Sequence, residues 1–99
     1  MFRKTYYTYI VECSDHSYYT GITNNIERRL SEHNLGIDPK SYICARRPVV
    51  LKYCEAFYYV REAIAREKQI KGWSRGKKQA LIAENKEALV ELSKRLRKK

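Results

Sequence analysis

Two short stretches near the start of the chain alternate between apolar and polar residues. They span residues 7–11 and 18–23, and both are rich in Tyr, Thr and Ile, a composition typical of half-buried strands. Residues 14–17, with the sequence SDHS, supply the polar side chains that favour a turn. The pattern therefore predicts a β-hairpin.

The length of the hairpin loop decides which side chains share a face of the sheet. A three-residue loop pairs odd-numbered positions of the two strands, so that Tyr9 and Tyr19 lie on one surface. A two-residue loop would place them on opposite faces. The sequence leaves both registers open.

The apolar spacing becomes helical shortly after Gly21. Three polar residues are candidates for the helix N-cap: Thr23, Asn24 and Asn25. Ile26 and Leu30 form the expected inward stripe. Asn34 or Gly36 is expected to end the helix, because both residue types tolerate a left-handed backbone. Arg29 and His33 lie four residues apart and are therefore neighbours on this helix.

Residues 35–48 lack periodicity and are predicted to form a loop. Four of its residues are candidates for binding a nucleic-acid backbone: Lys40, Tyr42, Arg46 and Arg47. Arginine and lysine pair with phosphate, and a tyrosine ring offers a stacking surface. The alternative is an ordinary surface loop whose charges only favour solubility.

Residues 49–59 are rich in β-branched and aromatic residues and are predicted to form a third strand. A helix is expected over residues 61–72. Its apolar stripe comprises Val60, Ala63, Ile64 and Ile70. Glu67 falls on the same stripe, where an unpaired carboxylate would be costly. Glu67 therefore needs a cation, a metal ion or hydrogen-bond donors.

Two alternatives for this acidic site remain open. Glu67 can be part of a structural ion pair, for example with Arg29. Glu62 is the other acidic candidate on this helix, but it lies nearer the helix start, where an acid is favoured in any case.

The chain is expected to finish with a further helix. Gly72 ends the preceding one, Trp73 packs back on the core, and Ser74 caps the last helix. Asn85 is a candidate break within it. Residues 94–99 are almost wholly basic, which is typical of a frayed tail or one that contacts nucleic acid.

The charge of the chain favours a polyanionic partner. It has 21 basic and 11 acidic residues among 99, for a net charge of +10. Residues 66–99 hold 12 of the basic residues and 4 of the acidic ones. Neutralising phosphates releases their condensed counterions, so nucleic acid is the expected partner. A solvated helix face remains the alternative.

Length and cysteine content limit the class of protein. A chain of 99 residues supports one core, and 43% hydrophobic residues indicate a folded chain. Cys13, Cys44 and Cys54 have neither an even count nor C-x-x-C spacing, so free thiols in a reducing cytoplasm are expected. No run is long enough to cross a bilayer, and no secretory leader is expected.

The order of four motifs resembles a known family. Tyr7 to Cys13 (YTYIVEC), Tyr19 to Thr23 (YTGIT), Glu27 to Asn34 (ERRLSEHN) and Arg46 to Pro48 (RRP) follow one another here. The chain resembles GIY-YIG nuclease domains, in particular a small single-domain subgroup of uncharacterised bacterial members. The likeness covers roughly residues 5–83. His16 stands where the subgroup usually has Gly, so we expect a glycine-like backbone angle there.

The resemblance implies roles for six residues. Tyr9 would orient or deprotonate the attacking water, and Tyr19 would position water or phosphate. Arg29 would clamp the scissile phosphate, and His33 would contact phosphate or relay a proton. Glu67, followed by the pair Ile70–Lys71, would be the ligand of a divalent metal ion, Mg²⁺ or Mn²⁺. Lys71 is a further candidate for phosphate contact. A tyrosine base requires a phenol pKa well below about 10, or a hydroxyl held close to the metal.

The predicted protein is an α/β domain: a small three-stranded mixed or antiparallel sheet flanked by helices in the order β-β-α-β-α-α. Residues 1–85 form the nuclease-like domain, and residues 86–99 form a basic helical extension of it. The expected function is metal-dependent DNA endonuclease activity in DNA repair or recombination, with DNA rather than RNA as partner.

Two alternative functions remain open. One is a nucleic-acid-binding module of the same fold with poor or no turnover, and another is a purely structural protein. Since the chain has no room for a separate DNA-binding domain, targeting would depend on its basic surface or on a protein partner. We expect a monomer or a weak dimer.

Overall fold

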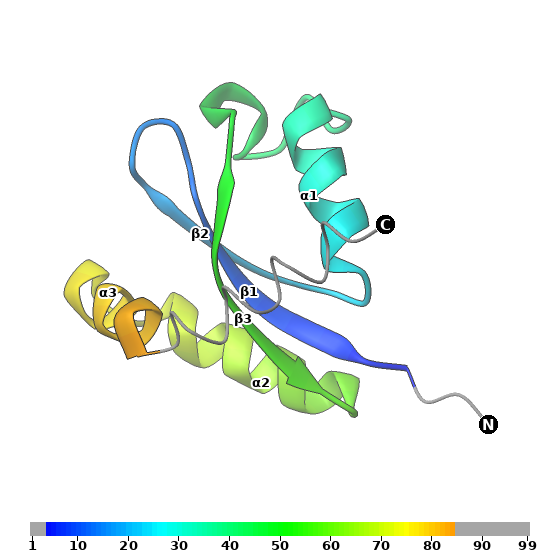
Figure 1. Cartoon of the computed structure of the whole chain (residues 1–99), viewed down its shortest axis with the longest axis vertical. Helices are drawn as coiled ribbons and strands as arrows, with labels where there is room; N and C mark the ends of the chain where they lie inside the picture. Colours follow the sequence, from blue (N-terminus) through cyan, green and yellow to red (C-terminus); the bar gives the residue numbers. More distant parts are fainter. Residues whose placement is uncertain (1–3, 85–99) are drawn as a thin grey trace.

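The computed structural model describes residues 4–84, which form a three-stranded sheet covered by helices (Figure 1). The strands are β1 (Tyr6–Glu12), β2 (Tyr18–Thr23) and β3 (Val50–Phe57). The α-helices are α1 (Ile26–Leu35), α2 (Val60–Lys71) and α3 (Arg75–Glu84), and a short 3₁₀ turn, η1 (Cys44–Arg46), precedes β3. The predicted β-β-α-β-α-α order is confirmed. The expectations for Asn85 and for residues 86–99 lie outside the described residues.

The sheet has the strand order β2-β1-β3, and both pairings are antiparallel. Of the two predicted forms, mixed or antiparallel, the structure has the antiparallel one. In the central strand Tyr9 lies opposite Gly21 on one side and Cys54 on the other. This register brings the two tyrosine motifs together.

The hairpin loop contains three residues. The Cys13 backbone N–H donates to the Ser17 carbonyl at 2.8 Å, leaving Ser14, Asp15 and His16 in the loop. His16 has a φ of 67°, the left-handed conformation expected from its position. Odd-numbered positions of β1 and β2 therefore share a face, as the three-residue alternative predicts.

The two faces of the sheet belong to two hydrophobic clusters. Tyr9 and Val11 of β1 pack with Ile26 of α1, whereas Ile10 packs with Ile70 of α2 and Leu81 of α3. Figure 1 shows α1 on one side of the sheet and α2 with α3 on the other. Because side chains alternate along a strand, Tyr9 faces α1.

The ends of α1 follow from local chemistry. Asn25 is the N-cap, and its side chain accepts the Arg28 backbone N–H at 2.9 Å. Gly36 ends the helix in a left-handed conformation with a φ of 68° and donates its N–H to Glu32 and His33 carbonyls. Both features agree with the sequence-based expectation.

The predicted apolar stripe of α2 is wrong at two positions. Val60 and Ile64 are 42% and 36% exposed, whereas Ala63 and Ile70 are fully buried. The rotation of α2 about its own axis is consistent with two contacts to the sheet that the apolar periodicity does not predict. The Thr8 hydroxyl of β1 donates to the Ala63 carbonyl at 2.8 Å, and Arg66 donates to Glu55 of β3 at 3.0 Å.

The residues between α2 and α3 behave as predicted. Trp73 is half-buried and packs on the cluster around Ile10. The Ser74 hydroxyl accepts the Lys77 backbone N–H at 3.2 Å, which caps α3. Helix α3 therefore closes the second face of the sheet.

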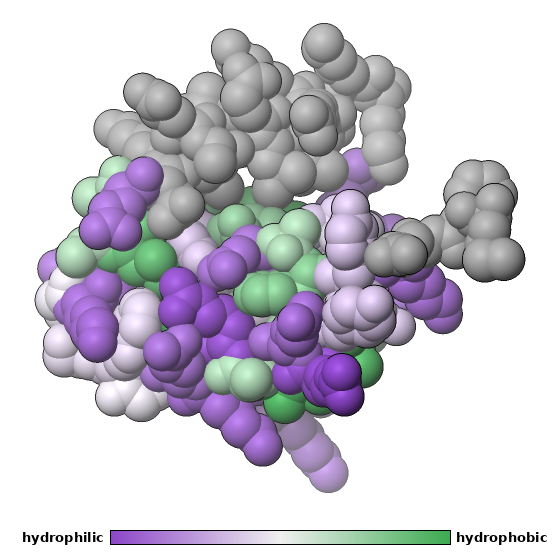
Figure 2. All heavy atoms as spheres, turned by 90° about the horizontal axis from the view of Figure 1, so that it is seen from below, coloured by the Kyte–Doolittle hydropathy of each residue, from purple (hydrophilic) through white to green (hydrophobic). Residues whose placement is uncertain are grey.

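Within residues 4–84 no helix is long and apolar enough to cross a bilayer. On the face seen in Figure 2, hydrophilic side chains are interspersed with smaller apolar areas. The three cysteines are free: Cys13 is buried, and Cys44 and Cys54 are half-buried.

Candidate active site

The Tyr9 ring lies across the backbone of Gly21. Tyr9 is 1% exposed, and a Cβ atom added to Gly21 would lie 2.6 Å from the Tyr9 hydroxyl oxygen. Only a residue without a side chain leaves room for the ring at this register position. The Tyr-x-Gly motif thus aims the Tyr9 hydroxyl over β2.

Three rings meet at this hydroxyl. Tyr9 Oη lies 2.9 Å from His33 Nε2. The Tyr19 ring packs edge-on against the His33 ring, with their centroids 5.7 Å apart, and lies 6.5 Å from the Tyr9 ring. Strands β1 and β2 and helix α1 therefore bring together the three residues that the sequence predicted.

Burial sets the protonation of the Tyr9–His33 pair. Burial, followed by the charge of Tyr19, raises the pKa of Tyr9 to about 12. The lowered phenol pKa required of a tyrosine base is therefore not found: the ring sits in the core, where a phenolate is disfavoured. Burial, reinforced by the Arg29 charge, lowers the pKa of His33. Near neutral pH the pair consists of a phenol and a neutral imidazole.

Arg29 lies on α1 one turn before His33. Its Nε donates to Glu32 Oε1 at 3.2 Å, and its Nη1 donates to the Ile22 carbonyl of β2 at 3.4 Å. The side chain remains 34% exposed. Arg29 is therefore held beside the tyrosine–histidine pair with part of its guanidinium open to solvent.

Glu67 of α2 is largely buried, with 18% of its side chain exposed. Its Oε2 lies 3.2 Å from Lys71 Nζ, one turn later. The suggested ion pair with Arg29 is therefore wrong, because Arg29 pairs with Glu32 and Glu67 pairs with Lys71. After burial, the charges that raise the Tyr9 pKa include Glu67, which places this carboxylate in the electrostatic environment of the Tyr9 hydroxyl.

Glu67 offers one carboxylate, a ligand of the type that hard divalent cations prefer. Residues 4–84 contain no group of three or more His, Cys, Asp or Glu side chains suited to a metal ion. Mg²⁺ does not require such a cage, since it is commonly held by one or two carboxylates, substrate phosphate and water. Glu67 supplies the carboxylate. Glu62, the alternative acid, is exposed in the first turn of α2.

The loop between α1 and β3 contributes a stack of side chains. The Arg46 guanidinium lies 3.8 Å above the Tyr42 ring, and the Tyr42 ring stacks on Tyr19 with centroids 6.2 Å apart. Arg46 also donates to Asp15 of the hairpin loop at 3.1 Å. Tyr42 and Arg46 are thereby brought to the edge of the tyrosine–histidine site.

The other predicted nucleic-acid contacts are more dispersed. Lys40 is exposed next to an Asp38 turn. Arg47 donates to the Cys44 carbonyl at 2.7 Å, and its guanidinium lies against Gly36. Lys71 is on α2 beside Glu67, away from the loop.

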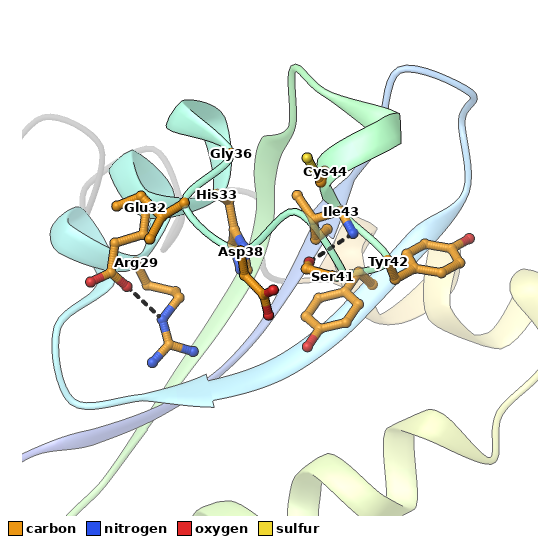
Figure 3. Close-up of a pocket in the computed structure, with 11 residues that line it drawn as sticks. Arg29, Glu32, His33, Gly36, Asp38, Ser41, Tyr42, Ile43 and Cys44 are labelled. Carbon is orange, nitrogen blue, oxygen red and sulfur yellow. Dashed lines mark hydrogen bonds and ion pairs between the residues drawn. The ribbon is translucent and has the colours of Figure 1, made fainter.

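A pocket of about 530 Å³ opens beside the site. Arg29, Glu32 and His33 of α1 form one side, and Asp38, Ser41 and Tyr42 of the following loop form the other (Figure 3). Tyr19, Ile37, Ile43 and Cys44 add apolar surface. The pocket therefore joins the loop to the residues around Tyr9.

Sequence reasoning missed the residue that attaches the loop to α1. The Asn34 side chain accepts the Val49 backbone N–H at 2.8 Å and donates to the Val49 carbonyl at 3.2 Å. The sequence suggested Asn34 only as a helix terminator. No local signal indicates this pairing, because it joins residues 15 positions apart.

The sequence also matches a model of the GIY-YIG catalytic domain over residues 5–80. The chain belongs to the GIY-YIG catalytic domain family. The chain is 43% identical to a UPF0213 protein of Bacillus pumilus over 97% of this chain and all of the relative. It is 46% identical to a UPF0213 protein of Halobacterium salinarum over 78% of this chain and 99% of the relative.

Two solved structures are similar to this GIY-YIG chain. One is the solution NMR structure of a UPF0213 protein from Bacillus halodurans, with 38% identity and a TM-score of 0.52 over 80% of this chain and 83% of the other. The second, from E. faecalis, has 38% identity and a TM-score of 0.55 over 80% and 84% of the two chains. The family and the fold support a nuclease-type role.

Proposed function

We propose that this protein is a metal-dependent endonuclease that hydrolyses phosphodiester bonds in DNA, acting in repair or recombination in the cytoplasm. The observation that carries the proposal is the Tyr9–His33 hydrogen bond of 2.9 Å, in a pair whose electrostatic environment includes the Arg29 and Glu67 charges. All four residues lie within the stretch that matches the catalytic domain.

The proposed role of each site residue follows from the chemistry of its side chain. Arg29 binds the scissile phosphate through its exposed guanidinium edge, for which its planar donors are suited. Tyr19 lies next to His33 and positions the attacking water or the phosphate. Lys71 provides a second positive charge near Glu67 and contacts the neighbouring phosphate.

The raised pKa of Tyr9 indicates a relay rather than a preformed phenolate. The attacking water gives a proton to Tyr9 Oη while Tyr9 passes its own proton to His33 Nε2. His33 accepts it because the imidazole is neutral. The water oxygen then bonds to phosphorus, the bond to the leaving oxygen breaks, and that oxygen takes a proton from solvent.

Glu67 would hold the divalent ion, Mg²⁺ or Mn²⁺, which when bound offsets the negative charge that develops on the phosphate. The burial of the Glu67 side chain and the packing of α2 on the sheet support this assignment. Lys71 must then exchange its ion pair with Glu67 for a phosphate contact.

The decisive experiment is cleavage of labelled single-stranded, duplex and branched DNA with Mg²⁺ or Mn²⁺. Glu67→Gln is expected to lower the cleavage rate roughly 100-fold or more, because several kcal/mol of transition-state stabilisation depend on the ion. Glu62→Gln, on the exposed side of the same helix, is the matched control and is expected to retain activity. Circular dichroism would verify that both variants are folded.

The second candidate function is a nucleic-acid-binding module with little or no turnover. The Lys71–Glu67 ion pair favours it, because this pair occupies the carboxylate that would hold the metal ion. Salt-dependent DNA binding without metal-dependent cleavage would establish this candidate. Activity that survives Glu67→Gln would contradict the proposed metal ligand.

A further inference from the structure

The pocket beside the tyrosine–histidine site has the size and lining of a ligand site. Its volume of about 530 Å³ lies within the range of about 300–1,000 Å³ found for small-molecule sites. The Tyr19 and Tyr42 rings and Ile43 supply apolar surface, and Asp38 and Ser41 supply polar groups. Such a lining suits a flat heterocycle with polar edges.

The position of the pocket relates it to the proposed scissile phosphate. Arg29 and His33 line the pocket and also belong to the catalytic group. A nucleotide whose phosphate contacts Arg29 therefore has its base within reach of the pocket. Figure 3 shows Arg29 and His33 projecting from α1, opposite the loop that carries Ser41 and Tyr42.

The charge of the pocket favours a base over a second phosphate. In a chain with a net charge of +10, two of the lining residues are acidic, Glu32 and Asp38. Glu32 is paired with Arg28 and Arg29. Asp38 forms no ion pair within residues 4–84, and its Oδ1 accepts the Lys40 backbone N–H at 3.1 Å. A carboxylate repels phosphate but accepts hydrogen bonds from base N–H groups.

The pocket is held open by contacts that do not depend on a ligand. Tyr42 is fixed between Arg46 and Tyr19 and donates its hydroxyl hydrogen to Ser17 at 2.9 Å. The Ser41 hydroxyl accepts the Ile43 N–H at 3.0 Å. Preorganised walls reduce the ordering cost of binding.

We infer that this pocket binds one unpaired nucleobase of the substrate strand, and that the protein therefore acts on single-stranded or locally unpaired nucleic acid. The inference rests on the proposed function for the position of the phosphate. A base within a duplex is stacked and has its Watson–Crick edge occupied, so it cannot enter. Guanine is the preferred base, because its N1–H and N2–H groups point in the same direction and suit the Asp38 carboxylate.

The test separates binding from cleavage. Affinities of the full chain are measured by fluorescence anisotropy in EDTA at fixed ionic strength. The probes are a guanine-containing single strand, an oligo-dT of equal length, and a hairpin that pairs the guanine-containing sequence. We expect the guanine-containing strand to bind roughly tenfold more tightly than either of the others.

Asp38→Asn tests the proposed contact without removing the turn, since the amide oxygen can still accept the Lys40 N–H. It is expected to abolish the preference for guanine over thymine while leaving oligo-dT binding nearly unchanged. Glu84→Gln removes the same charge from an exposed position on α3 and is expected to keep the preference. Equal affinities for the hairpin and the single strand would overturn the inference, as would an unchanged guanine preference in Asp38→Asn.

Cleavage assays then distinguish the two proposals. Guanine preference without metal-dependent cleavage supports the base pocket and contradicts the nuclease function. Metal-dependent cleavage of fully paired DNA at the rate found for single strands supports the nuclease function and overturns the base pocket.

Discussion

At the scale of single residues, the site depends on the lack of a side chain at Gly21 and on the partly buried hydrogen bond between Tyr9 and His33. Gly21 leaves space for the Tyr9 ring, and the Tyr9 hydroxyl oxygen lies 2.9 Å from His33 Nε2. The Tyr9 ring is buried in the core, and this burial is the largest cause of the raised pKa of its hydroxyl. Burial of Tyr9 therefore both fixes the position of its hydroxyl and makes that hydroxyl a weaker acid.

Gly21→Ala is expected to reduce stability by about 1–3 kcal/mol, because the added methyl group overlaps the Tyr9 ring and forces the ring or β2 to move. Urea denaturation would measure the change. Gly76→Ala is the matched control: its added Cβ would meet no atom within 4 Å, and alanine favours a helix, so stability should stay equal or increase.

His33 is expected to titrate below its ordinary pKa of about 6.5, since burial and then Arg29 disfavour its charged form. NMR titration of the ring would measure the pKa, and Arg29→Gln should raise it. The relay needs a neutral imidazole, so cleavage should be lost only as the pH falls through this lowered pKa. An acid limb above pH of about 7 would contradict the role of His33 as proton acceptor.

At the scale of elements, the site is assembled where α1, the following loop and the hairpin meet. Asn34 joins the end of α1 to the start of β3 through two backbone hydrogen bonds. Thr8 and Arg66 set the rotation of α2, which decides that Glu67 is largely buried while Ile64 is exposed. The helices and strands supply the site residues, and the contacts of Asn34, Thr8 and Arg66 orient these helices and strands relative to one another.

Asn34→Ala is expected to reduce stability by about 1–3 kcal/mol, because it leaves both Val49 backbone groups without their side-chain partner. Ser31→Ala, on an exposed position of the same helix, should change stability by less than about 0.5 kcal/mol. Thermal denaturation would compare them. Equal losses in the two variants would show that the Asn34 contacts contribute nothing net.

At the scale of the whole molecule, the excess of positive charge and the candidate site are expected to act together. A net charge of +10 attracts a phosphate backbone regardless of sequence. In the proposed base-binding arrangement, discrimination between paired and unpaired strands comes from the pocket, since charge alone does not distinguish them strongly. Overall DNA affinity is therefore expected to change in Lys40→Gln, whereas the preference for an unpaired guanine is expected to change in Asp38→Asn.

Lys40→Gln is expected to weaken DNA binding and to reduce the slope of log K against log salt concentration by about 0.7–0.9, because Lys40 is exposed on the loop beside the pocket. Lys52→Gln is the control for net charge: Lys52 lies on β3 and pairs with Glu12. Titrations between 50 and 200 mM salt, roughly the range over which such slopes are resolved, would measure both. An identical change in the two variants would indicate a general charge effect rather than a contact by Lys40.

The left-handed backbone of His16 was expected from the resemblance to a subgroup that usually has Gly at this position. The sequence by itself determined the element order and limited the caps of α1 to Thr23, Asn24 or Asn25 at its start and to Asn34 or Gly36 at its end. These features depend on local periodicity and on backbone preferences of single residues. The motif order also identified the family and the residues that gather around Tyr9. The alternating pattern of the hairpin allowed two strand registers, one for a two-residue loop and one for a three-residue loop, and did not choose between them.

Only the tertiary structure decided what depends on contacts between distant residues. The antiparallel register places Tyr9 over Gly21, and cross-strand contacts rotate α2 so that Val60 and Ile64 face solvent. Arg29 pairs with Glu32 and Glu67 pairs with Lys71, each within its own helix, so that within residues 4–84 no ion pair joins α1 to α2. The pKa of Tyr9 rises because its hydroxyl is buried, and the extent of burial is a property of the assembled core rather than of any local pattern.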